Sequence, residues 1–86
     1  MPFTSFLDYL SLEKNYSKHT LIAYHKDLLG FREFALSEFD FSEVNSVSYA
    51  IIRSWIVKLV GDGVSNRTIN RKISSLRTYY KFLLKI

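Results

Sequence analysis

Apolar residues recur at three- and four-residue spacing in four segments of the chain, which is the period of a helix buried along one side. The last segment shows it most clearly, through the stripe Ile69, Ile73, Leu76, Tyr80 and Leu83. No segment alternates as a strand would. We therefore predict an all-α domain with helices at about residues 3–14, 18–36, 47–60 and 65–85.

The second of these helices is predicted to be the centre of the bundle. Its core stripe consists of Leu21, Tyr24, Leu28, Phe31 and Ala35. A second apolar strip follows Ile22, Leu29 and Leu36, so this helix should contact neighbours on two sides. The first helix should bury Phe3, Phe6 or Leu7, and Leu10, and the third should bury Ile51, Trp55 and Leu59.

Residues with cap and turn preferences separate the predicted helices. Ser17 is placed to cap the second helix, Asn45 or Ser46 the third, and Ser65 or Asn66 the fourth. Gly61-Asp62-Gly63 ends the third helix, because glycine adopts the left-handed conformation required beyond a helix C-terminus. In the acidic and aromatic connection at 37–46, Phe39 and Phe41 should fold back onto the core.

Positive charge is concentrated in residues 64–86. This segment has no acidic residue and six basic ones, which are Arg67, Arg71, Lys72, Arg77, Lys81 and Lys85; the preceding residues carry six basic and eight acidic side chains. A solvated helix face is the ordinary explanation of charge, but such faces usually mix signs, and like charges four residues apart cost a few tenths of a kcal/mol. The pattern favours an anionic partner such as nucleic acid.

The composition bounds the class of protein. Eighty-six residues make one small domain, and the absence of cysteine excludes disulfides and thiolate metal sites. No signal peptide and no apolar run of about 20 residues is present, so we expect a soluble, cytoplasmic chain with no membrane partner.

Catalytic and metal-binding patterns are missing from the sequence. His19 and His25 are six residues apart, off a common helical face, and no carboxylate pair or phosphate-binding loop accompanies them. We expect the chain to have no catalytic residue, no metal, no cofactor and no small-molecule substrate.

Two helix starts resemble contact surfaces. Ser17-Lys18-His19-Thr20 and Ser65-Asn66-Arg67-Thr68 share the pattern S-x-x-T and combine hydroxyls, cations and free backbone N–H groups, which suit a phosphate. A plain capping turn would also explain the serines. The second start continues into further polar residues, namely Arg71, Lys72, Ser74, Ser75 and Arg77. Two similar starts suggest two helices presented to one duplex.

At these residues the chain resembles a known family. The strings S-K-H-T-L-I-A-Y-H-K-D-L-L-G-F-R-E-F (17–34) and V-S-N-R-T-I-N-R-K-I-S-S-L-R-T-Y-Y-K-F-L (64–83) are similar to the N-terminal core-binding domain of tyrosine recombinases of the Xer and phage-integrase type. The resemblance implies a SAM-like orthogonal bundle that clamps one side of the recombination site through its second and fourth helices. Its partners would be double-stranded DNA and other recombinase protomers.

The resemblance also implies the contact residues. Ser17, Lys18, His19 and Thr20 would meet phosphates or nearby bases, and the groove would be lined by Arg67, Thr68, Arg71, Lys72, Ser74, Ser75 and Arg77. The stripe favours Arg67, Arg71 and Ser74 for direct contact, whereas Lys72 and Arg77 would reach phosphates or neighbouring helices.

The family's catalytic residues belong to a separate C-terminal domain, so none of the tyrosines here receives the nucleophile's role. The chain ends at Lys85-Ile86, where an interdomain linker would begin, and we expect an excised fragment of a tyrosine recombinase. Phe82 falls on the polar side of the last helix and should pack on something absent from the chain.

Two alternatives remain open. A helix-turn-helix regulator would use the short turn at Gly61-Asp62-Gly63, but it needs a dimer interface or an effector domain that the sequence does not show. A SAM-like protein-interaction domain would show an exposed apolar patch and no salt-dependent affinity for DNA.

Overall fold

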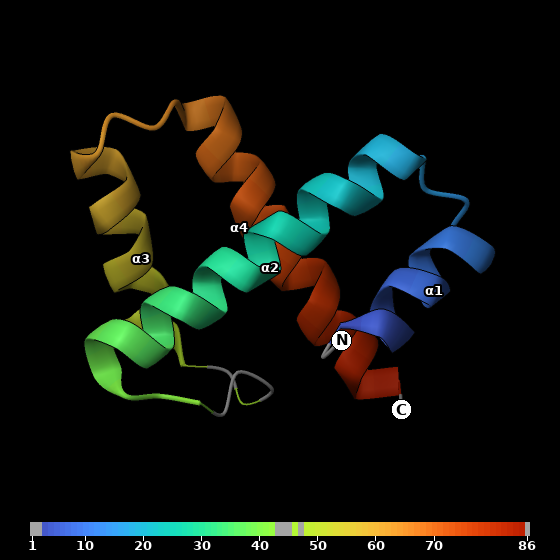
Figure 1. The fold of residues 1–86 in the computed structure, drawn as a ribbon, viewed down its shortest axis with the longest axis horizontal. Coiled ribbons are helices and arrows are strands. Elements are labelled where there is room, and N and C mark those ends of the chain that lie inside the picture. Colours follow the sequence, from blue (N-terminus) through green and yellow to red (C-terminus); the bar gives the residue numbers. More distant parts are fainter. Residues whose placement is uncertain (1–2, 43–45, 47, 86) are drawn as a thin grey trace.

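Four helices form the part of the chain that the computed structural model describes, residues 3–42, 46 and 48–85, and this part contains no strand. The helices are α1 (Thr4–Leu12), α2 (Lys18–Phe39), α3 (Tyr49–Gly61) and α4 (Asn66–Lys85), as Figure 1 shows. Each predicted helix is present, with both ends within three residues of the expected positions. The all-α prediction is confirmed. No helix in the described ranges has the length and apolar content needed to cross a membrane.

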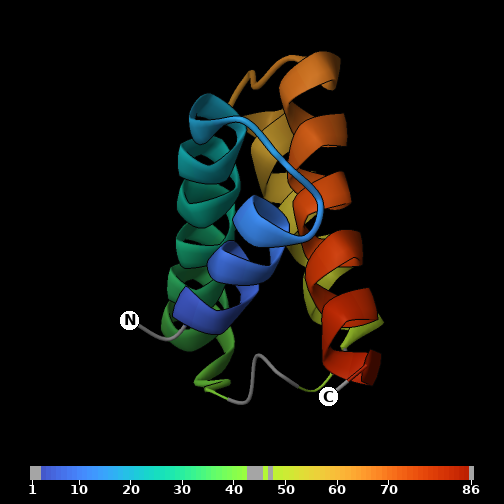
Figure 2. The same ribbon diagram turned by 90° about the vertical axis from the view of Figure 1, so that its right-hand side faces the viewer.

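Helix α2 is the centre of the arrangement, because it contacts each of the other three helices. It crosses α4 near the middle of Figure 1, with α3 beside its C-terminal half and α1 on the other side. Seen from the side, α2 and α4 stand next to each other and α1 lies in front of them (Figure 2). The N-terminal ends of α2 and α4 lie along the same edge, at the top of both views.

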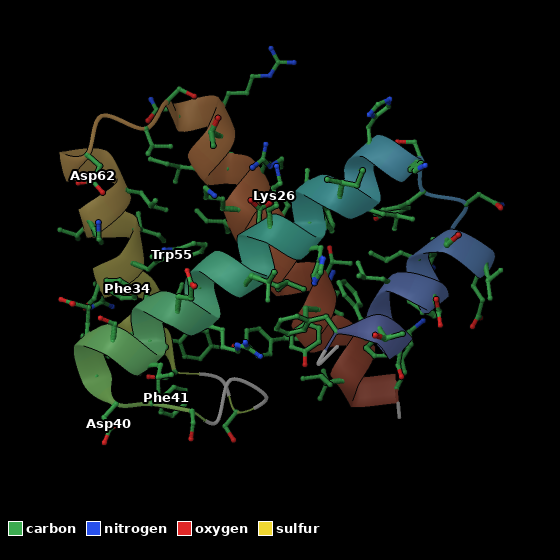
Figure 3. The ribbon with its side chains drawn as sticks, viewed as in Figure 1. Lys26, Phe34, Asp40, Phe41, Trp55 and Asp62 are labelled. Carbon is green, nitrogen blue, oxygen red and sulfur yellow. The ribbon has the colours of Figure 1, made fainter. Side chains whose placement is uncertain are left out.

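One apolar core joins all four helices. The predicted stripes of α1 and α3 are confirmed, since Phe3, Phe6, Leu10, Ile51 and Trp55 are buried. The remaining members of the core are Leu28, Phe31, Ala35, Leu76, Tyr79 and Phe82. Figure 3 shows Phe34 and Trp55 between α2 and α3, whereas Phe41 lies beyond the end of α2. Phe41 packs against the core, as predicted.

The second apolar strip predicted for α2 was wrong in two of its three positions. Ile22 is 47% exposed and Leu36 is 51% exposed, while Leu29 packs against the core. Phe39, also expected to fold back onto the core, is 48% exposed and stacks edge-on with Phe34 at 5.8 Å. The helices that pack against α2 do not cover these outward positions. Apolar spacing alone therefore predicted more burial for α2 than the structure shows.

The interpretation of Phe82 was also wrong, because its partners are within the chain. Its ring lies 5.4 Å from that of Phe6 and 5.0 Å from that of Tyr9, and its side chain is buried. Helix α1 packs against the C-terminal half of α4 and buries Tyr79 and Phe82 there, while the predicted stripe residues Tyr80 and Leu83 are partly buried and pack against the same core.

Capping was predicted correctly for two helices and incorrectly for one. Ser17 and Ser65 accept hydrogen bonds at the starts of α2 and α4. Helix α3 starts after Ser48, so Ser46 is not its cap, and Asn45 lies outside the described residues. Gly63 has φ +82°, a backbone conformation that residue types other than glycine rarely adopt. It turns the chain from α3 into α4.

Candidate nucleic-acid interface

The starts of α2 and α4 have the same local structure. The Ser17 hydroxyl accepts from the Thr20 backbone N–H at 3.2 Å and lies 2.9 Å from the Thr20 hydroxyl. The Ser65 hydroxyl accepts from the Thr68 backbone N–H at 3.2 Å and donates to the Thr68 hydroxyl at 3.1 Å. Each cap satisfies one backbone donor and leaves others in the first turn directed outward, at the positive end of the helix dipole.

Cationic and polar side chains surround these two starts. Ser17, Lys18 and His19 are exposed at the start of α2, and Arg67 is exposed at the start of α4. Thr20 and Thr68 are half-buried, which agrees with their contacts to the capping serines. The two predicted segments lie along one edge of the molecule (Figures 1 and 2), and each combines first-turn backbone N–H groups with at least one exposed basic side chain.

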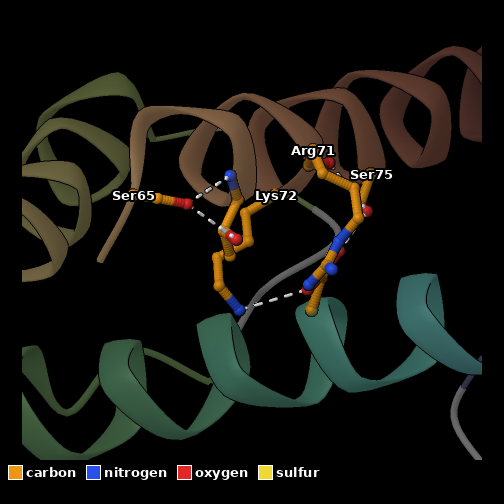
Figure 4. A network of polar contacts seen from close by, with 6 residues as sticks. Ser65, Arg71, Lys72 and Ser75 are labelled. Carbon is orange, nitrogen blue, oxygen red and sulfur yellow. Dashed lines mark hydrogen bonds and ion pairs between the residues drawn. The ribbon is translucent and has the colours of Figure 1, made fainter.

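A buried carboxylate lies where α2 and α4 pack together. Asp27 has no exposed surface, and its two oxygens accept four hydrogen bonds from α4. Arg71 donates Nε–H to Oδ2 at 3.1 Å and Nη2–H to Oδ1 at 2.7 Å. Lys72 donates to Oδ1 at 3.1 Å and Ser75 donates to Oδ2 at 2.7 Å. Figure 4 shows Arg71 and Lys72 reaching from α4 towards α2.

This group, Asp27 with Arg71, Lys72 and Ser75, is called the charged joint below. Burial by itself raises the pKa of Asp27, but the hydrogen bonds from Arg71, Ser75 and Lys72 outweigh burial and hold that pKa below its ordinary value. The bond to Asp27 in turn raises the pKa of Arg71. One negative and two positive charges leave the joint with a net charge of +1, so it adds to the cationic character of this part of the molecule.

The residues predicted on α4 differ in what they can reach. Arg71 keeps 43% of its side chain exposed although it is bound to Asp27. Lys72 is 19% exposed and also lies over the Trp55 ring, 5.7 Å from its centroid, so it does reach neighbouring helices. Ser75 has no accessible surface and makes its contacts within the protein. Ser74 is half-buried and Arg77 is exposed.

Other cations of α4 have different surroundings. Lys85 donates to the Tyr9 hydroxyl at 3.0 Å, on the side of α4 that faces α1. No carboxylate in the described ranges forms an ion pair with Arg67, Arg77 or Lys81. These three side chains are exposed and extend the positive surface along α4.

Sequence reasoning missed two residues of this region. Asp27 lies three residues after Tyr24 and four before Phe31, within the core stripe of α2, and an acid in that place signals a buried partner. Lys26 is exposed, and Figure 3 shows it on α2 close to the crossing with α4. Lys26 follows His19 by seven residues, and this helical spacing places both on one face of α2.

The geometry of the two helix starts offers hydrogen-bond donors that suit a phosphate. Within the described residues, no three side chains of the histidine, aspartate or glutamate type lie close enough to hold a metal ion. The arrangement can bind an extended anion along the edge that carries the two helix starts.

Comparison with known proteins identifies related sequences. The family described as phage integrase, N-terminal SAM-like domain, matches residues 3–85. A tyrosine recombinase XerC from Listeria innocua is 46% identical over 80 residues, which cover 93% of this chain and 26% of that protein. XerC proteins from Anoxybacillus flavithermus and Halalkalibacterium halodurans are 42% and 38% identical, over 93% and 95% of this chain. The chain spans about a quarter of the length of these curated relatives. No solved structure matches it significantly.

Proposed function

The chain belongs to the phage integrase N-terminal SAM-like domain family, and from this membership we propose that it is the DNA-binding module of a site-specific tyrosine recombinase. It would clamp the recombination-site duplex through α2 and α4. The observation that carries the proposal is the pair of identically capped helix starts on one edge of the molecule, each flanked by exposed cations.

The contacts in this proposal divide by exposure. Ser17, Lys18, His19, Arg67 and Arg77 are exposed and would reach backbone phosphates. Thr20, Thr68, Ser74 and Lys72 are partly covered and would contribute from the sides of the helices. Ser75 would act by fixing the charged joint rather than by touching DNA, since its side chain is buried.

The rest of the recombination reaction would lie outside these residues. DNA strand cleavage and rejoining would belong to another part of the recombinase, and this module would supply affinity, orientation on the duplex and contacts with other protomers in the cytoplasm. We expect the module alone to bind random duplex DNA weakly, with Kd on the order of 10⁻⁴–10⁻⁶ M.

Fluorescence anisotropy with random-sequence duplex DNA across a salt series tests the proposal. The wild-type chain should show a steep negative slope of log K against log salt. Arg67→Ala/Arg77→Ala should bind more weakly, with a slope shallower by about 2, because each lost phosphate contact removes roughly 0.9 from it. The matched control is Arg53→Ala/Lys58→Ala, which removes the same charge from α3.

The control double variant should keep most of the wild-type slope. If both double variants lose affinity equally, net charge alone drives binding and the proposed face is wrong. If the wild-type chain shows no salt-sensitive binding at low ionic strength, the DNA-binding proposal fails and a protein-interaction domain becomes the better account.

A further inference from the structure

The guanidinium of Arg71 is held on one edge and open on the other. Its Nε–H and one Nη2–H point to the two oxygens of Asp27, which occupies the side edge of the planar group. The end edge, formed by Nη1 and the second hydrogen of Nη2, makes no hydrogen bond within the described residues. The Arg71 side chain as a whole is 43% exposed, so part of it stays open to a ligand although the side edge is bound.

Asp27 cannot move to meet another partner. All four of its lone-pair positions are occupied, it is fully buried, and the donors from Lys72 and Ser75 hold it independently of Arg71. Because Asp27 is fixed, it fixes the plane and the direction of the Arg71 guanidinium. The conformational entropy of the arginine side chain is then lost on folding and not on binding.

A fixed arginine suits a base edge better than a phosphate. Two parallel N–H donors on the end edge match the O6 and N7 acceptors of guanine in the major groove. Phosphates are better followed by side chains that can adjust, and Arg67 and Arg77, which have no carboxylate partner in the described part of the chain, fulfil that condition.

We propose that Arg71 is the base-reading side chain of this module, that it recognises a guanine in the major groove, and that Asp27 is the positioning residue that aims it. The inference rests on the proposed function. It assigns sequence discrimination to one arginine of α4 and non-specific affinity to the others.

Selection from a random duplex pool, followed by sequencing of the bound fraction, measures the discrimination. The wild-type chain should enrich a guanine at one position about 5- to 160-fold, which corresponds to the roughly 1–3 kcal/mol expected for one bidentate contact. The same selection with 7-deazaguanine in place of guanine, which removes the N7 acceptor, should abolish that enrichment while the affinity for the unselected pool stays within about twofold.

Arg71→Lys is the decisive variant. A lysine keeps the positive charge and can pair with Asp27, but it lacks a second edge for a base. We expect normal folding by circular dichroism, an affinity for random DNA within about twofold of wild type, and loss of the guanine enrichment. Arg67→Lys is the matched control, the same exchange one turn earlier, and should keep the enrichment.

Asp27→Asn separates positioning from a structural role. The carboxamide cannot accept from both Arg71 nitrogens, and the net charge of the chain becomes more positive by one. Enrichment should therefore fall as in Arg71→Lys, while affinity for random DNA stays equal or rises. If Asp27→Asn loses its helical signal, Arg71→Lys alone decides the question.

The outcomes distinguish the two proposals. Salt-sensitive DNA binding without any guanine enrichment, or enrichment that survives Arg71→Lys, overturns the base-reading inference and leaves the proposed function intact. Loss of enrichment in Arg67→Lys as well as in Arg71→Lys also overturns it, because reading would not be confined to Arg71. Absence of salt-sensitive binding in the wild-type chain defeats the proposed function itself.

Discussion

Helix α4 is attached to its neighbours by two different kinds of contact. Its N-terminal half meets α2 through the charged joint, in which one buried carboxylate accepts four hydrogen bonds. Its C-terminal half meets α1 through rings that pack at 5.0–5.4 Å, with Tyr79 and Phe82 on α4 against Phe3, Phe6 and Tyr9. This second contact is called the aromatic joint.

The two joints should contribute differently to the fold. Aromatic burial is favourable over a range of arrangements, because the hydrophobic effect has no direction. The charged joint needs each donor at one distance and angle, and removing its charges from water offsets much of what its hydrogen bonds contribute. We infer that the aromatic joint supplies more of the stability, whereas the charged joint determines how α4 is rotated against α2 and where its outer side chains point.

The largest expected effect tests the aromatic joint. Phe82→Ala should lower the free energy of unfolding by about 3 kcal/mol, because it removes a buried ring and leaves a cavity. That loss is a large part of the roughly 5–15 kcal/mol available to a domain. Urea denaturation followed by circular dichroism measures it. The control is Leu84→Ala, at 87% exposure on the same helix, and equal losses in the two variants would contradict the buried position of Phe82.

A smaller loss is expected from the charged joint. Asp27→Ala should lower the free energy of unfolding by about 2 kcal/mol, less than a fully buried pair would lose, because Arg71 can turn to solvent once released. Glu33 is an exposed acid on the same helix, and Glu33→Ala should change the free energy of unfolding little. In a double-mutant cycle with Arg71→Ala, the two effects should not add. Additive losses would show that the bonds between the two residues contribute nothing.

The two helix caps should contribute equally, because their geometry is the same. Ser17→Ala and Ser65→Ala should each cost about 1 kcal/mol in urea denaturation. Ser37→Ala, at an exposed position inside α2, serves as the control. A loss in Ser65→Ala much greater than in Ser17→Ala would mean that the start of α4 depends on its cap more than on the charged joint.

The fold could be predicted from the sequence because it follows from local periodicity. Four helices, the stripes of α1 and α3 and the caps Ser17 and Ser65 depend on residues within a few positions of one another. Phe82 could not be placed in this way. Which of the neighbouring apolar residues near the end of α4 is buried depends on where α1 packs, and that is a tertiary property.

The two helix starts of the candidate site could be predicted from the sequence, whereas the charged joint between α2 and α4 could not. Exposed cations at two S-x-x-T starts can be read from the chain, since each start is a local structure. The charged joint connects residues 44–48 positions apart in the chain. The sequence therefore predicted DNA contacts for Arg71 and Ser75, and it did not identify Asp27 as the partner of Arg71, Lys72 and Ser75. An acid inside the α2 stripe and a fourth helix without acids were the signals that, taken together, would have pointed to Asp27.

The smallest expected effect is the response of the charged joint to acid. Because the pKa of Asp27 is lowered in the folded state, its contribution is fully present above its ordinary pKa of 3.8 and is lost as the pH falls through the lower folded value. Burial raises the pKa of Asp27 and the hydrogen bonds lower it, so the two effects partly cancel and the net lowering is the remainder. The part of the stability that depends on acid should therefore be small. Urea denaturation at pH 6 and below pH 4 should show a stability difference between wild type and Asp27→Asn that narrows in acid.

Glu33→Gln serves as the control for that measurement, because this exposed acid on α2 has no ion-pair partner in the described residues. Its difference from wild type should stay small at both pH values. If the difference for Asp27→Asn widens in acid, burial outweighs the hydrogen bonds at Asp27. The Asp27 carboxylate would then hold Arg71 only weakly. The inference that the charged joint orients α4, while the aromatic joint stabilises it, would be wrong in its first part.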